Sequence, residues 1–195
     1  QDTQTLFAAQ VLSDVLCGSN HAPLCRAILE QGLAEDVVLG CDEQCMQPNL
    51  LLRVQNFREA DLPAIEATIR NTLTALCENG LDRAQIEASL ASFEFKLRER
   101  DYGTMPRGLV FELEILSSWL YGGDPAVRLR FGEVFDTLHA AVGTGYYENL
   151  LRRLMLENPH TAEVLLQPSL TCGQARQDRE RESLGKTCKT LDEAQ

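Results

Sequence analysis

Two short runs of aliphatic and β-branched residues interrupt a chain whose apolar residues otherwise recur at helical spacing. The runs are EDVVLG (35–40) and NLLLRVQNF (49–57), and turn residues bound each of them. We predict two strands joined by CDEQCMQP, and the short linker favours an antiparallel pair. TAEVLLQP (161–168) predicts a further strand. Because strands and helices are segregated along the chain, we predict an α+β fold, with a small, mostly antiparallel sheet and helices packed on one face.

Helical periodicity covers most of the remaining sequence up to Asn158. Apolar residues three and four apart predict helices over 3–16, from Pro23 to the residue before Gly32, 62–79, 83–100, 106–121, from the GGDP break (122–125) to about 142, and 144–157. Asn20, Asp61 and Asp82 stand where N-caps are expected, the last with Gln85 in a capping-box pattern. The run 106–121 is apolar on nearly every face, which predicts a buried helix.

The composition changes after Pro168. Residues 174–193 are rich in Arg, Glu, Lys and Asp and carry little apolar surface. A polar helix with a thin apolar stripe needs a partner to be stable. We therefore predict one domain over residues 1–170 and a charged helix over residues 171–195.

Charge and cysteine content limit the partners and the compartment. The net charge of −11 argues against nucleic acid and against anionic membrane surfaces as partners. No signal-peptide pattern opens the sequence, and its first residues resemble the middle of a fold, so we expect a fragment of a longer protein. The seven cysteines are odd in number and irregularly spaced, which favours reduced thiols. We expect a bacterial cytoplasm or an organellar matrix rather than secretion.

The sequence offers no catalytic or metal-binding motif. Cys41 and Cys45 form a C-x3-C pair without a second pair of ligands nearby, so small structural thiols are the better interpretation than zinc. The three histidines fall in no two-histidine ligand spacing. A thiol enzyme that uses Cys17 or Cys25 with His21 is the weakest alternative, because such close sequence neighbours rarely reach catalytic geometry. A second open alternative is a peptide or carboxylate site at Tyr102 and Arg107.

Three blocks of sequence resemble presequence-protease-type peptidases of the pitrilysin and insulin-degrading-enzyme superfamily of zinc metallopeptidases. The blocks are GSNHAPLCRAILEQGLAEDVVLG (18–40), EASLASFEFKLRERDYGTMPRGLVFELEILSSWLYGGDP (87–125) and GYYENLLRRLMLENPHTAEVLLQPS (145–169). The resemblance covers most of residues 1–170.

The resemblance implies a position within a larger enzyme. Members of this superfamily have four homologous α+β domains in two halves, and the first domain holds zinc through H-x-x-E-H and a later Glu. This chain resembles the later part of the second, non-catalytic domain without its first strands, and residues 171–195 resemble the first arm of an interdomain hairpin. Because H-x-x-E-H is absent here, we expect no catalytic residue, metal ligand or cofactor in this chain, and zinc in another domain of a parent metalloendopeptidase.

The resemblance also implies a strand edge that holds the extended end of a peptide by β-augmentation. The matching positions are Ser19, Asn20, His21, Val38, Leu39, Gly40 and Cys41. The expected partners are the other domains of the same polypeptide and unstructured peptide substrates, and a homodimer could form through the unpaired edge. Two alternatives stay open: the edge pairs only within its own sheet, or the chain is a structural domain of an inactive peptidase homologue.

Overall fold

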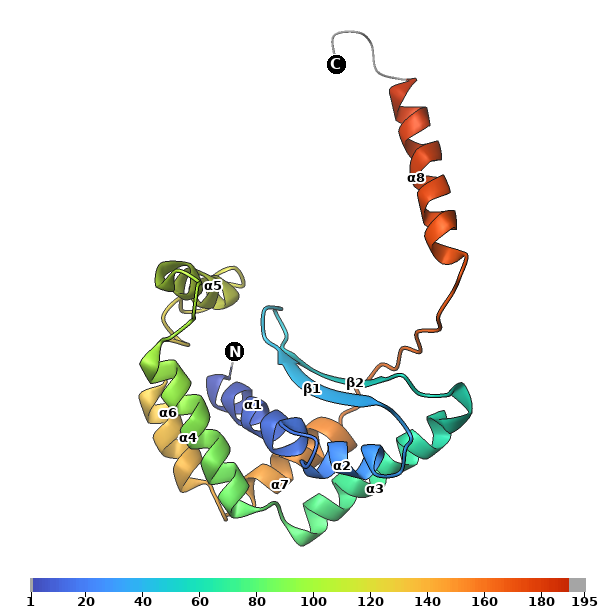
Figure 1. Cartoon of the computed structure of the whole chain (residues 1–195). Helices are drawn as coiled ribbons and strands as arrows, with labels where there is room; N and C mark the ends of the chain where they lie inside the picture. The colour runs from blue at the N-terminus through green and yellow to red at the C-terminus, as the bar shows by residue number, and fades with distance from the viewer. Residues whose placement is uncertain (1, 190–195) are drawn as a thin grey trace. The chain divides into compact units, whose positions relative to one another are not determined.

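The computed structural model describes residues 2–189 and has the predicted α+β architecture, with helices as its main component (Figure 1). The elements in chain order are α1 (Thr3–Cys17), α2 (Pro23–Leu29), β1 (Asp36–Asp42), β2 (Asn49–Gln55), the 3-10 helix η1 (Glu59–Asp61), α3 (Leu62–Asn79), α4 (Arg83–Glu99), α5 (Arg107–Trp119), α6 (Gly132–Ala140), α7 (Tyr146–Leu151), the π-helical turn η2 (Arg152–Leu156) and α8 (Cys172–Cys188). The chain divides into two compact units, Gln1–Asn158 and Pro159–Gln195.

The sheet consists of β1 and β2, which pair antiparallel as predicted. The register places Asp36 opposite Gln55 and Asp42 opposite Asn49. On β1 the side chains of Val37 and Leu39 are buried, whereas alternate positions are half-buried or exposed. Because buried and more accessible side chains alternate, one face of the strand packs against the helices, and there β1 contacts α1 and α2.

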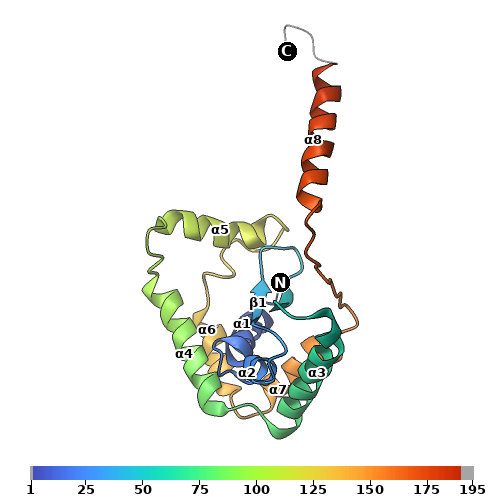
Figure 2. The same cartoon turned by 45° about the vertical axis from the view of Figure 1, so that its right-hand side comes forward.

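Helix α1 is the centre of the first unit. It contacts α2, β1, α4, α6 and α7, and its buried side chains come from nearly every face of the helix. Phe7 of α1 packs with Phe93 of α4 and Phe135 of α6, and the ring centroids lie 5.5–5.7 Å apart. Figures 1 and 2 show the surrounding helices arranged around α1. A helix that is apolar nearly all round is stable only in such an enclosed position.

Of the three predicted N-cap residues, only one makes a capping hydrogen bond. Asp82 caps α4 by accepting a hydrogen bond from the Ala84 amide at 2.9 Å. Asn20 does not cap α2, which starts after Ala22 with Pro23 in its first turn. Asp61 occupies the N-cap position of α3 but makes no capping bond, because its carboxylate accepts from Arg58 Nε at 2.6 Å.

The prediction of a buried helix over 106–121 was wrong. Helix α5 forms at this place, but its buried residues are Ser117 and Ser118, and its large apolar side chains are half-buried or, for Leu109, Leu113 and Trp119, exposed. The next helix was also predicted too early, because turns occupy residues 125–129 and α6 begins at Gly132. Asp124 stabilises these turns by accepting from the Ala126 amide and by pairing with Arg130.

The second unit contains residues 159–170 and α8. The prediction of a strand over 161–168 was wrong: these residues have no strand assignment and are exposed, and the sheet described for residues 2–189 contains only β1 and β2. A strand needs a hydrogen-bonding neighbour, so apolar, β-branched composition alone does not create one. Helix α8 is the predicted charged helix, and residues 190–195 of that prediction lie outside the described residues. The domain boundary near residue 170 stays a prediction.

No helix in the described part of the chain is both long and apolar enough to cross a bilayer.

We expect Leu16→Ala to lower the free energy of unfolding by about 2–5 kcal/mol, because Leu16 is fully buried in the central helix and its truncation leaves a cavity. Urea denaturation followed by circular dichroism measures the change. The control is Leu51→Ala on β2, where the side chain is half-exposed and the loss should stay within about 0.5 kcal/mol. Equal losses for the two variants would contradict the central position of α1.

Candidate functional site

Strand β1 has one edge paired with β2 and one edge that no strand of residues 2–189 covers. The carbonyl of Val37 accepts a hydrogen bond from the Cys25 thiol at 3.3 Å, so this carbonyl faces α2 and not β2. Main-chain groups of alternate residues in an antiparallel strand point to the same side. The backbone groups of Val37, Leu39 and Cys41 therefore face the second edge, which we call the β1 edge. Those of Val38 and Gly40 face β2.

Two thiols lie against the β1 edge. Cys25 of α2 bonds the Val37 carbonyl, and Cys17, at the end of α1, interacts with Cys25 and with the backbone of Leu39. Burial raises the pKa of the Cys17 thiol far above its usual value, and the contact with Cys25 raises it further. Burial also raises the pKa of Cys25. Both groups are therefore protonated at neutral pH, which argues against the thiol-enzyme alternative, because the thiolate is the nucleophile.

The predicted loop residues Ser19, Asn20 and His21 are exposed in the turn between α1 and α2. The amide of Ala22 donates to the Ser19 carbonyl at 3.0 Å and closes this turn. His21 lines a cavity of about 240 Å³ together with Arg26 of α2 and residues of the α3–α4 turn, and no residue of β1 lines it. The structure thus separates the predicted site into a strand part and a loop part, and only the flanks of the loop, Cys17 and Cys25, reach the strand.

The predicted strand residues lie together at the end of β1 that leads into the hairpin turn. Leu39 is buried, whereas Val38, Gly40 and Cys41 are half-buried. Gly40 stands opposite Leu51, and a Cβ atom added to it would have no heavy atom within 4 Å. Burial raises the pKa of Cys41 to about 11, and Glu43 acts in the same direction. The space beside Gly40 and the half-buried Cys41 leave this end of the strand accessible.

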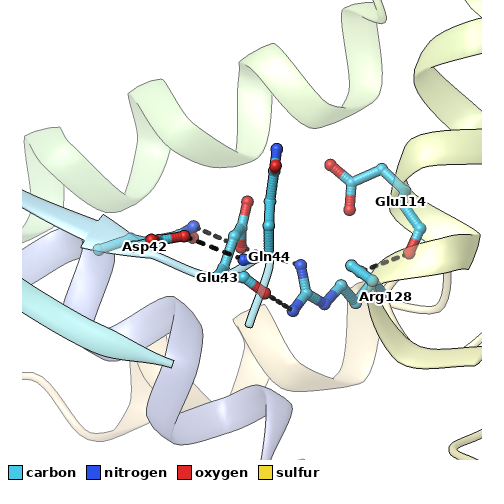
Figure 3. A network of polar contacts seen from close by, with 7 residues as sticks. Asp42, Glu43, Gln44, Glu114 and Arg128 are labelled. Carbon is cyan, nitrogen blue, oxygen red and sulfur yellow. Dashed lines mark hydrogen bonds and ion pairs between the residues drawn. The ribbon is translucent and has the colours of Figure 1, made fainter. Parts of the chain in front are cut away.

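A buried arginine, absent from the sequence predictions, holds the hairpin turn (Figure 3). The Arg128 side chain is about 3% exposed, its Nη2 donates to the Glu43 carbonyl at 2.8 Å, and its Nη1 lies 3.2 Å from Glu43 Oε2. Gln10 of α1 donates to the same carboxylate oxygen at 2.9 Å. The turn after β1 is therefore fixed to α1 and to the segment after α5. No local motif marks Arg128, because its partner lies 85 residues earlier in the chain.

Helix α5 approaches the same turn. Tyr121, just after α5, donates its hydroxyl hydrogen to the Gln44 carbonyl at 3.2 Å. Glu114 of α5 extends toward the Arg128 and Glu43 pair (Figure 3), and burial raises the pKa of Glu114, as does Glu43, whereas Arg128 lowers it. Beside this network lies a cavity of about 90 Å³, lined by aromatic rings of α1, α4 and α5 and by these charged groups. We call the contacts of Gln10, Glu43, Glu114 and Arg128 the turn network.

Two further candidate sites from the sequence are a metal at the Cys41 and Cys45 pair and a peptide or carboxylate site at Tyr102 and Arg107. The Cys45 thiol donates to Asp42 at 3.7 Å, and among residues 2–189 no three His, Cys, Asp or Glu side chains converge as metal ligands. The residues that the structure describes therefore do not fit a zinc ion. Tyr102 packs edge-on against Phe111, with the centroids 6.5 Å apart, and Arg100 Cζ lies over the Phe111 ring, 4.8 Å from its centroid. Tyr102 thus packs against α5 and the Arg107 side chain is exposed, and a peptide or carboxylate site at these two residues stays a prediction.

Comparisons with known proteins agree with the fold and with the family resemblance seen in the sequence. Residues 1–93 match the family described as the Peptidase M16 inactive domain. Protein HypA of Clostridium perfringens is 32% identical over 192 residues, which are 98% of this chain and 20% of that protein. Presequence protease 1, chloroplastic/mitochondrial, of Arabidopsis thaliana is 32% identical over 172 residues, which are 86% of this chain and 16% of that protein.

A solved structure shows the same fold at low sequence identity. The crystal structure of an inactive peptidase domain from Bordetella parapertussis has a TM-score of 0.56 and 14% identity, and the match covers 77% of this chain and 76% of that chain. The chain spans a fifth or less of the length of the two curated relatives above.

We expect Arg128→Met to lower the free energy of unfolding by about 3 kcal/mol, because it leaves the Glu43 carboxylate and carbonyl without their buried partner. Arg130→Met is the matched control, since Arg130 pairs with Asp124 in the same turn region but is mostly exposed. An exposed pair contributes about 1 kcal/mol or less. Urea denaturation of both variants measures the two changes. If Arg130→Met lowers the free energy of unfolding as much as Arg128→Met does, the structural role of the turn network is contradicted.

Because the pKa of Glu114 is raised, we expect Glu114→Gln to become more stable relative to wild type as the pH rises. Below about pH 4 the carboxyl is protonated in the folded and the unfolded chain, so the substitution changes little. As the pH rises, the unfolded chain ionises first, and the wild-type protein loses stability because the folded state retains the proton. Glu114→Gln avoids this loss, so its stability relative to wild type should increase between about pH 4 and pH 7. Glu112→Gln, an exposed position on the same helix, should show no such increase.

Proposed function

Because the chain carries the inactive M16 peptidase domain of presequence-protease-like proteins, we propose that it is a non-catalytic part of a zinc metalloendopeptidase that degrades unstructured oligopeptides. The two curated relatives described above extend far beyond the region that matches this chain, and one of them is named a presequence protease. Hydrolysis takes place at zinc in another domain of the parent enzyme, and this chain forms part of the chamber wall. The parent works in a bacterial cytoplasm or an organellar matrix, in line with the chloroplastic and mitochondrial names of its relatives.

Within this role the β1 edge holds the extended end of a substrate peptide. The observation that supports it is the orientation of β1, whose Leu39 and Cys41 main-chain groups point away from β2. An extended peptide that adds to such an edge is bound through its backbone, so binding depends little on its side chains. The open space at Gly40 and the half-buried Cys41 support a contact near the hairpin turn. The interaction of Cys17 with the Leu39 backbone leaves Cys41 as the principal contact.

A second candidate function is assembly alone, as in inactive structural homologues. The observation that favours it is that Cys17 and Cys25 already occupy the β1 edge at Leu39 and Val37. A shorter free edge offers fewer main-chain hydrogen bonds to a peptide. The two candidates differ in peptide affinity, because an assembly domain has none.

The test is Cys41→Pro, which removes an amide that faces the β1 edge. Proline is tolerated on an edge strand where its missing N–H would not pair within the sheet, so the fold should persist. We expect the variant to bind a fluorescein-labelled, unstructured peptide of about 20 residues at least tenfold more weakly than wild type, as measured by fluorescence anisotropy. Cys41→Ser is the matched control, because it retains the amide, and it should bind like wild type.

Two outcomes would contradict the proposal. No binding by the wild-type chain would favour the assembly domain, and equal binding by Cys41→Pro and Cys41→Ser would remove the β1 edge as the contact. Gly40→Pro is less informative, since the Gly40 amide faces β2 and its loss disrupts the sheet.

The same peptide should stay intact when it is incubated with the chain in the presence of zinc. Cleavage that a chelator abolishes would show that the chain itself is an enzyme.

A further inference from the structure

Helix α5 carries a stripe of leucines on its outer side. Leu109, Leu113, Leu116 and Leu120 recur at spacings of four, three and four, so they form one stripe along the helix. Leu109, Leu113 and Leu120 are 44%, 45% and 69% exposed, and Leu116 between them is half-buried. Trp119 and Tyr121 extend the exposed apolar surface and are 62% and 44% exposed. We call these residues the α5 face.

The opposite side of α5 is the more buried one, and it carries the polar Ser118 and Glu114 beside the half-buried Phe111. Ser118 lies nine residues after Leu109, about half a turn away around the helix axis at about 100° per residue. Ser117 and Ser118 are both buried, and Ser117 donates its hydroxyl hydrogen to the Glu114 carbonyl at 2.6 Å. A soluble helix normally has the reverse arrangement, with the apolar stripe inside.

Specific polar contacts fix this orientation. Tyr121 bonds the Gln44 carbonyl, and Glu114 points into the turn network with Arg128 (Figure 3). In both views α5 lies at the periphery of the first unit, and irregular segments join it to α4 and α6 (Figures 1 and 2). Rotating α5 to bury its leucines would separate these polar contacts, so the outward apolar face is a consequence of the turn network.

We propose that the α5 face docks against an apolar surface of another domain of the same, longer polypeptide. Five exposed large apolar side chains lie on this one short segment, whereas an ordinary protein surface exposes such side chains singly. Almost all of this chain aligns with a relative of which it makes up only 20%, so the relative contains four-fifths of its length outside the region described here. The choice of another domain as the docking partner rests on the proposed function, in which the chain is one domain of a larger peptidase.

Charge favours such a domain over a second copy of this chain. The net charge of −11 opposes the approach of two identical molecules. The exposed charges beside the α5 face, Arg107 and Glu112, have opposite signs, so the rim itself excludes neither an acidic nor a basic partner domain. A partner domain needs an apolar centre that accepts Trp119 and the leucine stripe, with a polar rim around it.

Hydrogen–deuterium exchange of residues 107–121 tests the proposal in the isolated chain and in the longer polypeptide. We expect at least tenfold slower exchange of these amides in the longer polypeptide. Leu113→Asp should abolish this protection there and leave the stability of the isolated chain unchanged, because it inserts a charge into the docked face only. Leu113→Met is the matched control, since it keeps an apolar side chain of similar volume and should retain the protection.

Three results would overturn the proposal. Equal exchange of residues 107–121 in both proteins would show that no other domain covers the α5 face. A loss of stability of the isolated chain with Leu113→Asp, but not with Leu113→Met, would show that the face is covered within the chain. A concentration-dependent dimer of the isolated chain in sedimentation experiments, abolished by Leu113→Asp, would identify a second copy as the occupant. None of these measurements uses a peptide, so the docking proposal can fail while the peptide-binding result with Cys41→Pro stands.

Discussion

The enclosure of α1 is the constraint on which the first unit depends. A helix that is apolar nearly all round has no favourable exposed orientation, so it requires neighbours on every side. The sheet supplies one neighbour and α2, α4, α6 and α7 supply the others. The Phe7, Phe93 and Phe135 rings then connect α1 to α4 and α6 through mutual contacts. A two-stranded sheet is only marginally stable alone, so β1 and β2 depend on this helix for their place.

The sequence predicts those features that depend on local periodicity. Spacings of three and four located the helices of the first unit, and the change to short β-branched runs located β1 and β2. Prediction failed where the deciding contact is distant. The run 161–168 has the composition of a strand but no neighbouring strand in the described chain.

The candidate site shows the same division between local pattern and distant contact. The strand residues Val38 to Cys41 could be located from sequence, because they belong to one element. Their separation from His21 could not, since it depends on how α2 packs against the α3–α4 turn. The thiols at the β1 edge also went unpredicted, because cysteine spacing says nothing about which carbonyl a thiol will meet. Arg128 and Glu43 lie far apart in sequence, so neither residue identifies the other.

The turn network relates the two surfaces to which we assign a role. Glu43 follows β1 by one residue, so the contacts that hold it also fix the end of the strand that presents Cys41. Glu114 and Tyr121 join the same turn from α5 and thereby direct the leucine stripe outward. One buried arginine therefore sets the position of the β1 edge and stands at the base of the α5 face. A domain that docks on α5 would restrain the turn through the same contacts, and by linkage an occupied β1 edge would favour docking to the same extent.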